Sequence, residues 1–175
     1  MGGMEITPAQ APTKPRLGRY DIDPADSAVR FRTRHLFGLA PVRGRFQIRA
    51  GTVDVTEPAS ETRVCVEIET ASLRSGNPAR DASVRSPRFL DASRYPVMVF
   101  VAEKMDGQDL LGTLTVGAVA RPVRLPVRVS GVSAGSFTAQ GTVRLDRTEF
   151  GVTASPGLAA RYLDVSLEVR CVARS

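Results

Sequence analysis

The sequence predicts an all-β domain whose antiparallel strands close into a barrel or pack as a sandwich, with a short helical insertion near residues 77–91. Three observations support this prediction. Apolar and polar residues alternate with a period of two along most of the chain, short turn signals separate the alternating runs, and no long amphipathic helix is available to cover a sheet. Short links favour antiparallel neighbours, and strands with one apolar face must bury those faces together.

Eight or nine strands follow from the alternation. Val29, Phe31 and Thr33, for example, alternate with three arginines, which gives that strand one apolar and one polar face. Two segments, near residues 95–102 and 110–116, are apolar on both faces, so periodicity is weaker evidence for a strand there. In chain order the expected strands lie near residues 29–34, 42–48, 53–55, 63–69, 95–102, 110–116, 123–130, 137–145 and 163–171.

One segment interrupts the alternation. Asn77-Pro78 is typical of a helix N-cap followed by proline at the first helical position, and Ser86-Pro87 repeats this pattern. Two short helical turns are therefore expected at residues 78–84 and 87–91. They would lie across an opening or an edge of the sheet.

The chain of 175 residues is long enough for one domain with its own core. Residues 1–17 contain several prolines and no periodic pattern, so we expect a flexible N-terminal tail before a domain at residues 18–175. No apolar run approaches the ~20 residues of a membrane span, so no transmembrane segment is expected. The first residues also lack the apolar stretch of a secretory signal, which favours a cytoplasmic location.

Basic residues outnumber acidic ones, with 24 Lys and Arg against 18 Asp and Glu and a net charge of +6. The arginines are spread along the chain, which favours a compositional bias over a phosphate-binding site. Only 6% of the residues are aromatic, and they do not interleave with basic residues as in proteins that stack on bases. No nucleic-acid partner is therefore expected, and a module for acidic partners is the least favoured of three functional hypotheses.

The inward-facing positions of the expected strands are almost wholly aliphatic or phenylalanine. A small antiparallel barrel can be filled by such side chains or can hold one small ligand among them. The sequence leaves both alternatives open.

No metal site or cofactor is expected, because two cysteines and one histidine offer no metal-ligand spacing. Cys65 falls on the polar phase of its strand and Cys171 on the apolar phase. Side chains on opposite faces do not favour a disulfide.

An enzymatic alternative would use His35, Asp81 or Tyr162 as acid or base to cyclise or isomerise an apolar metabolite. The sequence places no catalytic partner beside His35, which shares the inward phase of its strand, so no catalytic residue is assigned and binding is favoured over catalysis. Arg80 and Asp81 have two interpretations. They belong either to an arginine-lined mouth that contacts a polar or phosphate head group, or to a local Asp–Arg pair that fixes the helical turns.

Several short motifs resemble, in order and spacing, those of the YceI-like family of polyisoprenoid-binding proteins. The resemblance runs from about residue 18 to residue 172. The matching stretches are Tyr20-Asp-Ile-Asp-Pro24, Ser27-Ala-Val-Arg-Phe31 with His35-Leu36, Val42-Arg-Gly-Arg-Phe46, Ala71-Ser72-Leu73, Gly76-Asn77, Arg80-Asp81, Arg85-Ser86 with Phe89, Tyr95-Pro96 with Phe100, Leu114-Thr115, Arg121-Pro122-Val123, and Asp146-Arg147 with Phe150-Gly151.

The resemblance implies an antiparallel eight-stranded, lipocalin-like barrel with an apolar cavity. It also implies binding, carriage or sequestration of an isoprenoid-like or other lipid ligand there. The expected partner is thus an apolar lipid or isoprenoid small molecule, while homodimer formation is left open. The candidate ligand-binding residues are Phe31, His35, Phe46, Ile48, Val66, Ile68, Arg80, Asp81, Phe89, Phe100, Leu114, Leu125, Phe137 and Val143.

Overall fold

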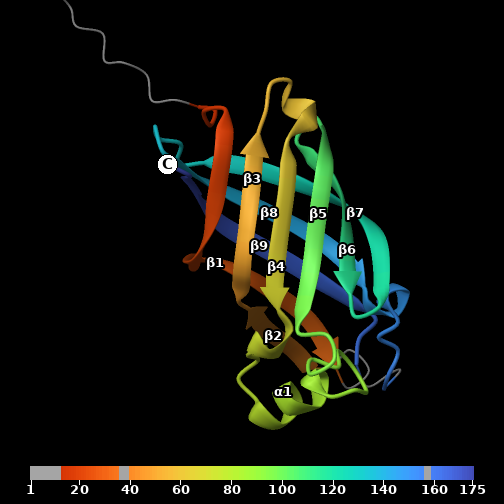
Figure 1. The fold of residues 1–175 in the computed structure, drawn as a ribbon. Helices are drawn as coiled ribbons and strands as arrows, with labels where there is room; N and C mark the ends of the chain where they lie inside the picture. Colours follow the sequence, from red (N-terminus) through yellow and green to blue (C-terminus); the bar gives the residue numbers. More distant parts are fainter. Residues whose placement is uncertain (1–12, 36–39, 156–158) are drawn as a thin grey trace, which may run out of the picture.

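The computed structural model describes residues 13–35, 40–155 and 159–175, and only the backbone at His35. These residues form one antiparallel sheet with a single short α-helix (Figure 1). The strands are β1 (Gly18–His35), β2 (Ala40–Phe46), β3 (Ile48–Val55), β4 (Arg63–Glu69), β5 (Val97–Asp106), β6 (Asp109–Val116), β7 (Val119–Ser130), β8 (Ser136–Asp146) and β9 (Tyr162–Ala173). The helix is α1 (Pro78–Arg85), and the short 3-10 turns are η1 (Ala59–Glu61), η2 (Thr70–Ser72) and η3 (Arg147–Phe150).

The sheet closes because β9 pairs with β1 as well as with β8. β2 and β3 are separated only by Gln47, and both pair with β1, so together they occupy one position around the barrel. Eight positions result, which confirms the predicted antiparallel eight-stranded barrel. Closure gives most strands a partner on both sides, whereas β2, among the described strands, pairs with β1 alone and forms a single bridge, through Arg45, to Arg74.

β1 bends in its middle, where its register with β9 shifts between Asp23 and Ala28. Pro24 cannot donate a ladder hydrogen bond, and the Asp23 carboxylate instead accepts one from the Ala25 N–H at 2.9 Å. The first half of β1 therefore pairs with β3 and the second half with β2. Because of this bend, β1 contributes to the barrel wall beside β3 in its first half and beside β2 in its second half.

One part of the barrel interior is filled by its own side chains. Tyr20 packs edge-on against Phe137, with ring centroids 4.8 Å apart, and Cys171 is fully buried beside them. A second cluster joins Phe100 and Leu125, and the Phe100 ring lies so close to Gly112 that a Cβ there would clash with it. For this part of the barrel, the filled-core alternative is correct.

The helical insertion is confirmed for its first half. α1 begins after Asn77, whose side chain accepts a hydrogen bond from the Arg80 N–H at 3.1 Å. The expected second helical turn at residues 87–91 is wrong: the chain there forms successive turns. The Leu90 N–H bonds back to the Val84 carbonyl, and Asp91 has a left-handed φ of 49°, so the segment folds against α1 instead of continuing as a helix. No helix in the described residues has the length and apolar character needed to cross a membrane.

Both cysteines are free thiols, as the opposite phases of Cys65 and Cys171 predict. Burial raises the pKa of the Cys171 thiol to about 12, whereas Cys65 is half-buried. Because the thiolate is the reactive form, we expect a thiol reagent at pH 8 to modify one cysteine in the native protein and both after denaturation. Peptide mapping should identify Cys65 as the native site. Equal native labelling of both would contradict the buried position of Cys171.

Candidate functional site

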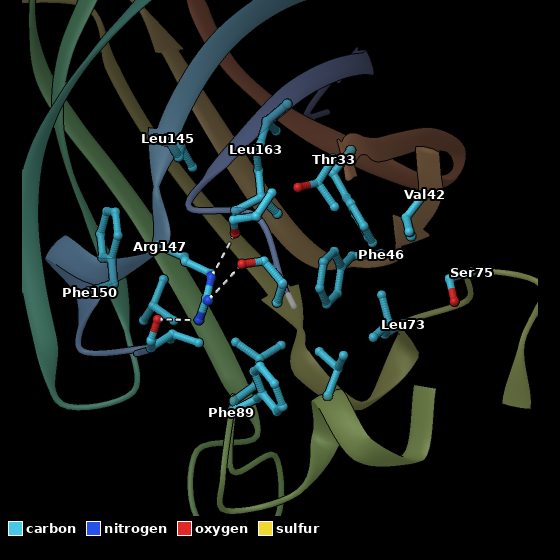
Figure 2. A pocket seen from close by; sticks show the side chains of 18 of the residues that line it. Thr33, Val42, Phe46, Leu73, Ser75, Phe89, Leu145, Arg147, Phe150 and Leu163 are labelled. Carbon is cyan, nitrogen blue, oxygen red and sulfur yellow. Dashed lines mark hydrogen bonds between the residues drawn. The ribbon is translucent and has the colours of Figure 1, made fainter. Parts of the chain in front are cut away.

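A cavity of about 420 Å³ occupies the end of the barrel that α1 covers. Its walls come from the inner faces of the strands, and α1, the turns after it and residues around η3 close this end (Figures 1 and 2). Pockets that hold small organic ligands span about 300–1,000 Å³. The interior is thus divided into a part filled by side chains and a hollow part. The filled-core alternative describes the first, and the alternative of a barrel with room for a small ligand describes the second.

The walls of this cavity are apolar. Phe31 of β1 and Phe46 of β2 lie with ring centroids 5.7 Å apart. Gly44, directly opposite Phe31 on β2, leaves room for the Phe31 ring, which a Cβ there would meet. The apolar strand residues that line the cavity are Val29, Phe31, Val42, Phe46, Ile68, Met98, Leu114, Val116, Leu145, Leu163 and Val165. Strand alternation places these side chains inside while their neighbours face solvent.

The segment from Leu73 to Leu90 supplies the end of the cavity. Leu73 is almost completely buried, and Val84, Phe89 and Leu90 add apolar contacts from α1 and the turns after it. Figure 2 shows Leu73 and Phe89 directed toward the same space as Phe46. Short α1 has little apolar surface of its own, so its position depends on the polar contacts around it.

Asp81 anchors α1 to the preceding loop. Its buried carboxylate accepts hydrogen bonds from the Ser75 N–H at 3.1 Å and from the Ser75 hydroxyl. Arg85 donates to the Leu73 carbonyl instead of pairing with Asp81. Among the described residues, the local Asp–Arg pair that was one of the two interpretations from the sequence is not formed, and Asp81 does not line the cavity either.

Replacing Asp81 is expected to loosen this end of the barrel. In Asp81→Ala the Ser75 N–H and hydroxyl lose their acceptor, so the free energy of unfolding should fall by about 1–3 kcal/mol. Asp81→Asn keeps one acceptor oxygen and should cost less. Denaturant unfolding of both variants measures this, and an Asp81→Ala variant as stable as the parent chain would disprove the anchoring role.

Arg147 is the most strongly held cation at the cavity. Its guanidinium donates to the carbonyls of Ala160 (2.8 Å), Val152 (2.8 Å) and Ala159 (3.1 Å), as the dashed lines in Figure 2 show. Burial lowers the pKa of this guanidinium, but an arginine in such a site stays charged at neutral pH. The side chain therefore ties the chain after η3 to the chain before β9 and brings a positive charge to the cavity lining.

A few other polar groups reach the same space. Thr33, Ser75, Arg80 and Ser83 line the cavity together with the apolar residues. The buried Nε of Arg80 has no hydrogen-bond partner within the described parts of the chain. Because this nitrogen is buried against the protein, it does not itself face the open space of the cavity.

The candidate residues from the sequence fall into three groups. Phe31, Phe46, Ile68, Arg80, Phe89 and Leu114 line the cavity, and whether a ligand touches them stays a prediction. Six others lie outside its lining and pack around the filled part: Ile48, Val66, Phe100, Leu125, Phe137 and Val143. Asp81 anchors α1, and the side chain of His35 lies outside the described residues.

Two residues of the enzymatic alternative, Asp81 and Tyr162, do not line the cavity. Tyr162 is 44% exposed on β9, with the guanidinium groups of Arg144 and Arg161 over its ring. Asp81 is enclosed by its contacts with Ser75. Within the described residues, no three His, Cys, Asp or Glu side chains form a metal site.

Sequence reasoning missed several lining residues, chiefly Arg147, Phe150, Met98 and Leu73. Arg147 and Phe150 belong to the last of the matching motifs in the sequence. A charged residue just after a strand, however, gives no periodic signal that its side chain turns inward. Met98 lies in a strand that is apolar on both faces, where parity is uninformative.

Comparison with known proteins supports the fold and its extent. A family model described as the YceI-like domain matches residues 20–173. A UPF0312 protein of Enterobacter sp. strain 638 is 32% identical over 167 residues, covering 88% of this chain and 85% of that protein. A UPF0312 protein of Vibrio cholerae is 30% identical over 164 residues, covering 87% and 85%.

Two solved structures have a similar barrel. BcnA of Burkholderia cenocepacia superposes with a TM-score of 0.76 at 22% identity, over 85% of this chain and 98% of that chain. A polyisoprenoid binding domain from Saccharophagus degradans superposes with a TM-score of 0.74 at 14% identity, over 91% and 100%. At these identities the similarity establishes the fold alone.

Proposed function

The chain belongs to the YceI-like family, and from this membership we propose that its barrel binds an apolar, isoprenoid-like lipid and carries or sequesters it. The observation that carries the proposal is the 420 Å³ cavity with apolar strand walls at one end of the barrel. One structural relative is described as a polyisoprenoid binding domain, which is consistent with a ligand of this class.

Hydrophobic burial provides the binding free energy in this proposal. Each CH₂ group transferred from water to an apolar cavity contributes about 0.8 kcal/mol, so a hydrocarbon tail gains affinity without charged contacts. Part of this gain is offset by the freedom that the ligand loses on binding. A cavity formed by rigid strands limits the cost of ordering the protein itself.

The cationic groups at the cavity would orient the ligand. Arg147 carries its charge into the lining, and the side chain of Arg80 also lines the cavity. A ligand with a polar oxygen at one end and a hydrocarbon tail would match both features. The tail would then point toward Ile68 and Leu114, where the lining is apolar.

The test is direct. Purified protein is extracted with organic solvent and analysed by mass spectrometry, and the stripped protein is titrated with a neutral apolar fluorophore and then with the isoprenoid alcohol farnesol. We expect a co-purifying lipid, an increase in fluorescence on titration, and displacement of the fluorophore by farnesol. Stripped, folded protein that binds neither compound would reject the proposal.

A further inference from the structure

Five arginines lie together on the outer face of β1, β2 and the chain after η2. We call Arg30, Arg32, Arg43, Arg45 and Arg74 the arginine strip; all five side chains are exposed. The strip is continuous because these residues are opposite one another in the sheet. Arg30 is in register with Arg45, Arg32 with Arg43, and Arg45 forms a bridge with Arg74.

This arrangement is costly for folding. Like charges directly opposite each other across two strands destabilise the pair. Within the described parts of the chain, none of the five guanidinium groups forms an ion pair with a carboxylate. Asp164 of β9 is in register with Arg32 of β1, but its carboxylate is ion-paired with Arg144 at 3.9 Å. The three juxtaposed like-charge pairs therefore have no ion pair of their own among the described residues, and the carboxylate opposite Arg32 is shared with Arg144.

The strip lies on the outside of the cavity wall. Alternation along β1 and β2 directs Phe31 and Phe46 inward and the neighbouring arginines outward. The same two strands therefore present a hydrocarbon-binding surface on one side and a cationic surface on the other. Arg74 extends the cationic surface to the segment that closes the cavity, next to Leu73.

The surface beside the strip has the groups that bind phosphate esters. Arg30, Arg32, Arg43 and Arg144 border a depression of about 610 Å³, together with the hydroxyl residues Thr142 and Ser166. Asp164 is the one acidic residue that the structure describes in this lining, and it is ion-paired with Arg144. Exposed Tyr162 lies close by, with Arg144 over its ring at 4.8 Å. Clustered arginines attract anionic lipid head groups, and tyrosine is enriched at the membrane–water interface.

We propose that the arginine strip is a docking surface for a bilayer containing anionic phospholipids. Charge complementarity supplies the attraction, and the cavity behind the same wall explains why a lipid surface is favoured over another polyanion. Docking in this orientation would bring the end of the cavity near the membrane, where an apolar ligand could enter or leave. The preference for a lipid surface and that last step rest on the proposed function, whereas the electrostatic attraction of the strip for an anionic surface does not.

The experiment measures co-sedimentation of the full chain with vesicles of phosphatidylglycerol and, separately, of phosphatidylcholine. We expect binding to phosphatidylglycerol that weakens as salt rises, because screening shortens the range of exposed charges. The double variant Arg32→Gln/Arg43→Gln should bind about 30-fold more weakly, as two arginines near an anionic surface predict. Arg32→Lys/Arg43→Lys retains both charges and should restore most of the binding.

The matched control is Arg63→Gln/Arg128→Gln, which removes the same charge from exposed arginines of β4 and β7 outside the strip. It should bind within about twofold of the parent chain, since the effect depends on position more than on net charge. Equal losses in both double variants, or equal binding to the two vesicle types, would overturn the proposal. Tighter binding of duplex DNA than of phosphatidylglycerol at the same salt would also overturn it.

Two readouts separate this inference from the proposed function. Thermal unfolding should show the strip variant to be at least as stable as the parent chain, because a like-charge pair is removed. The variant should also bind the apolar fluorophore normally. If the parent chain bound phosphatidylglycerol vesicles but not the fluorophore, the ligand proposal alone would be rejected. If it bound the fluorophore but not the vesicles, docking alone would be rejected.

Discussion

Ile68→Glu is expected to weaken binding of a neutral apolar ligand at least 100-fold at pH 8. Ile68 lines the cavity on β4, and its cross-strand neighbours Ile48 and Met98 are apolar, so they offer an introduced carboxylate no partner. In the empty cavity water can hydrate the charge, but a bound hydrocarbon removes that water. Desolvating an unpaired charge costs several kcal/mol, which opposes the burial of the tail. Fluorophore titration of the parent and variant chains measures the effect.

The pH dependence gives this prediction a second check. A covering hydrocarbon raises the pKa of the introduced carboxyl, so the complex holds more protons than the free variant. Binding by the variant should therefore strengthen as the pH falls through that pKa, whereas binding by the parent chain should change little. Ile68→Gln, similar in shape but neutral, should lose about tenfold. Val101→Glu, on the outer face of β5 where the side chain is 39% exposed, should lose nothing. Equal losses at both positions would mean that the cavity is not the binding site.

The fold was predictable because its strands carry the alternation themselves. Along β9 the residues from Leu163 to Cys171 alternate without interruption, and the barrel buries that apolar phase. Asn77-Pro78 correctly marked the start of α1 for an equally local reason. Ser86-Pro87 carried the same pattern but did not start a helix, because the Leu90 N–H bonds to the Val84 carbonyl in α1. The conformation of residues 87–91 thus depends on a contact with α1, which the local sequence pattern does not reveal.

The cavity was harder to predict than the barrel. Phe31 and Phe137 have the same inward phase, yet Phe31 faces the hollow part and Phe137 packs on Tyr20 in the filled part. Parity tells which side of the wall a residue occupies, but not how far along the barrel the filling extends. That extent depends on where large side chains meet across the interior, as the Phe100 ring does over Gly112.

The clustering of arginines on β1 and β2 was also hard to predict from the sequence. The arginines of β1 and β2 were dispersed in the sequence, so compositional bias was a sufficient explanation for them there. Antiparallel register brings Arg32 opposite Arg43 and Arg30 opposite Arg45, which turns two separate runs into one surface. Clusters formed by pairing are visible only once register is known.

Arg147→Met is expected to lower the free energy of unfolding by about 3 kcal/mol and the unfolding temperature by about 10 °C. Methionine replaces the apolar stem of the arginine side chain but cannot donate to the carbonyls of Val152, Ala159 and Ala160. Three partly buried acceptors then lose a charged donor at once. Since these bonds hold the chain before β9 against η3, backbone amide exchange at residues 159–161 should also accelerate. Calorimetry and hydrogen exchange measure the two effects.

Arg161→Met is the matched control, because Arg161 lies at the same end of the barrel but makes a different kind of contact. Its guanidinium is 61% exposed and is ion-paired with Asp146 at 2.7 Å. The Thr148 hydroxyl, which is the largest cause of the lowered pKa of Asp146, would keep that carboxylate hydrogen-bonded without Arg161. The Asp146 side chain is only 9% exposed, but the exposed guanidinium is screened by solvent and Thr148 still satisfies the carboxylate. Loss of such a partner should cost about 1 kcal/mol, well below the cost of Arg147→Met. If the two variants were equally destabilised, loss of an arginine charge would explain both. The three carbonyl contacts of Arg147 would then have no special role in closing the cavity.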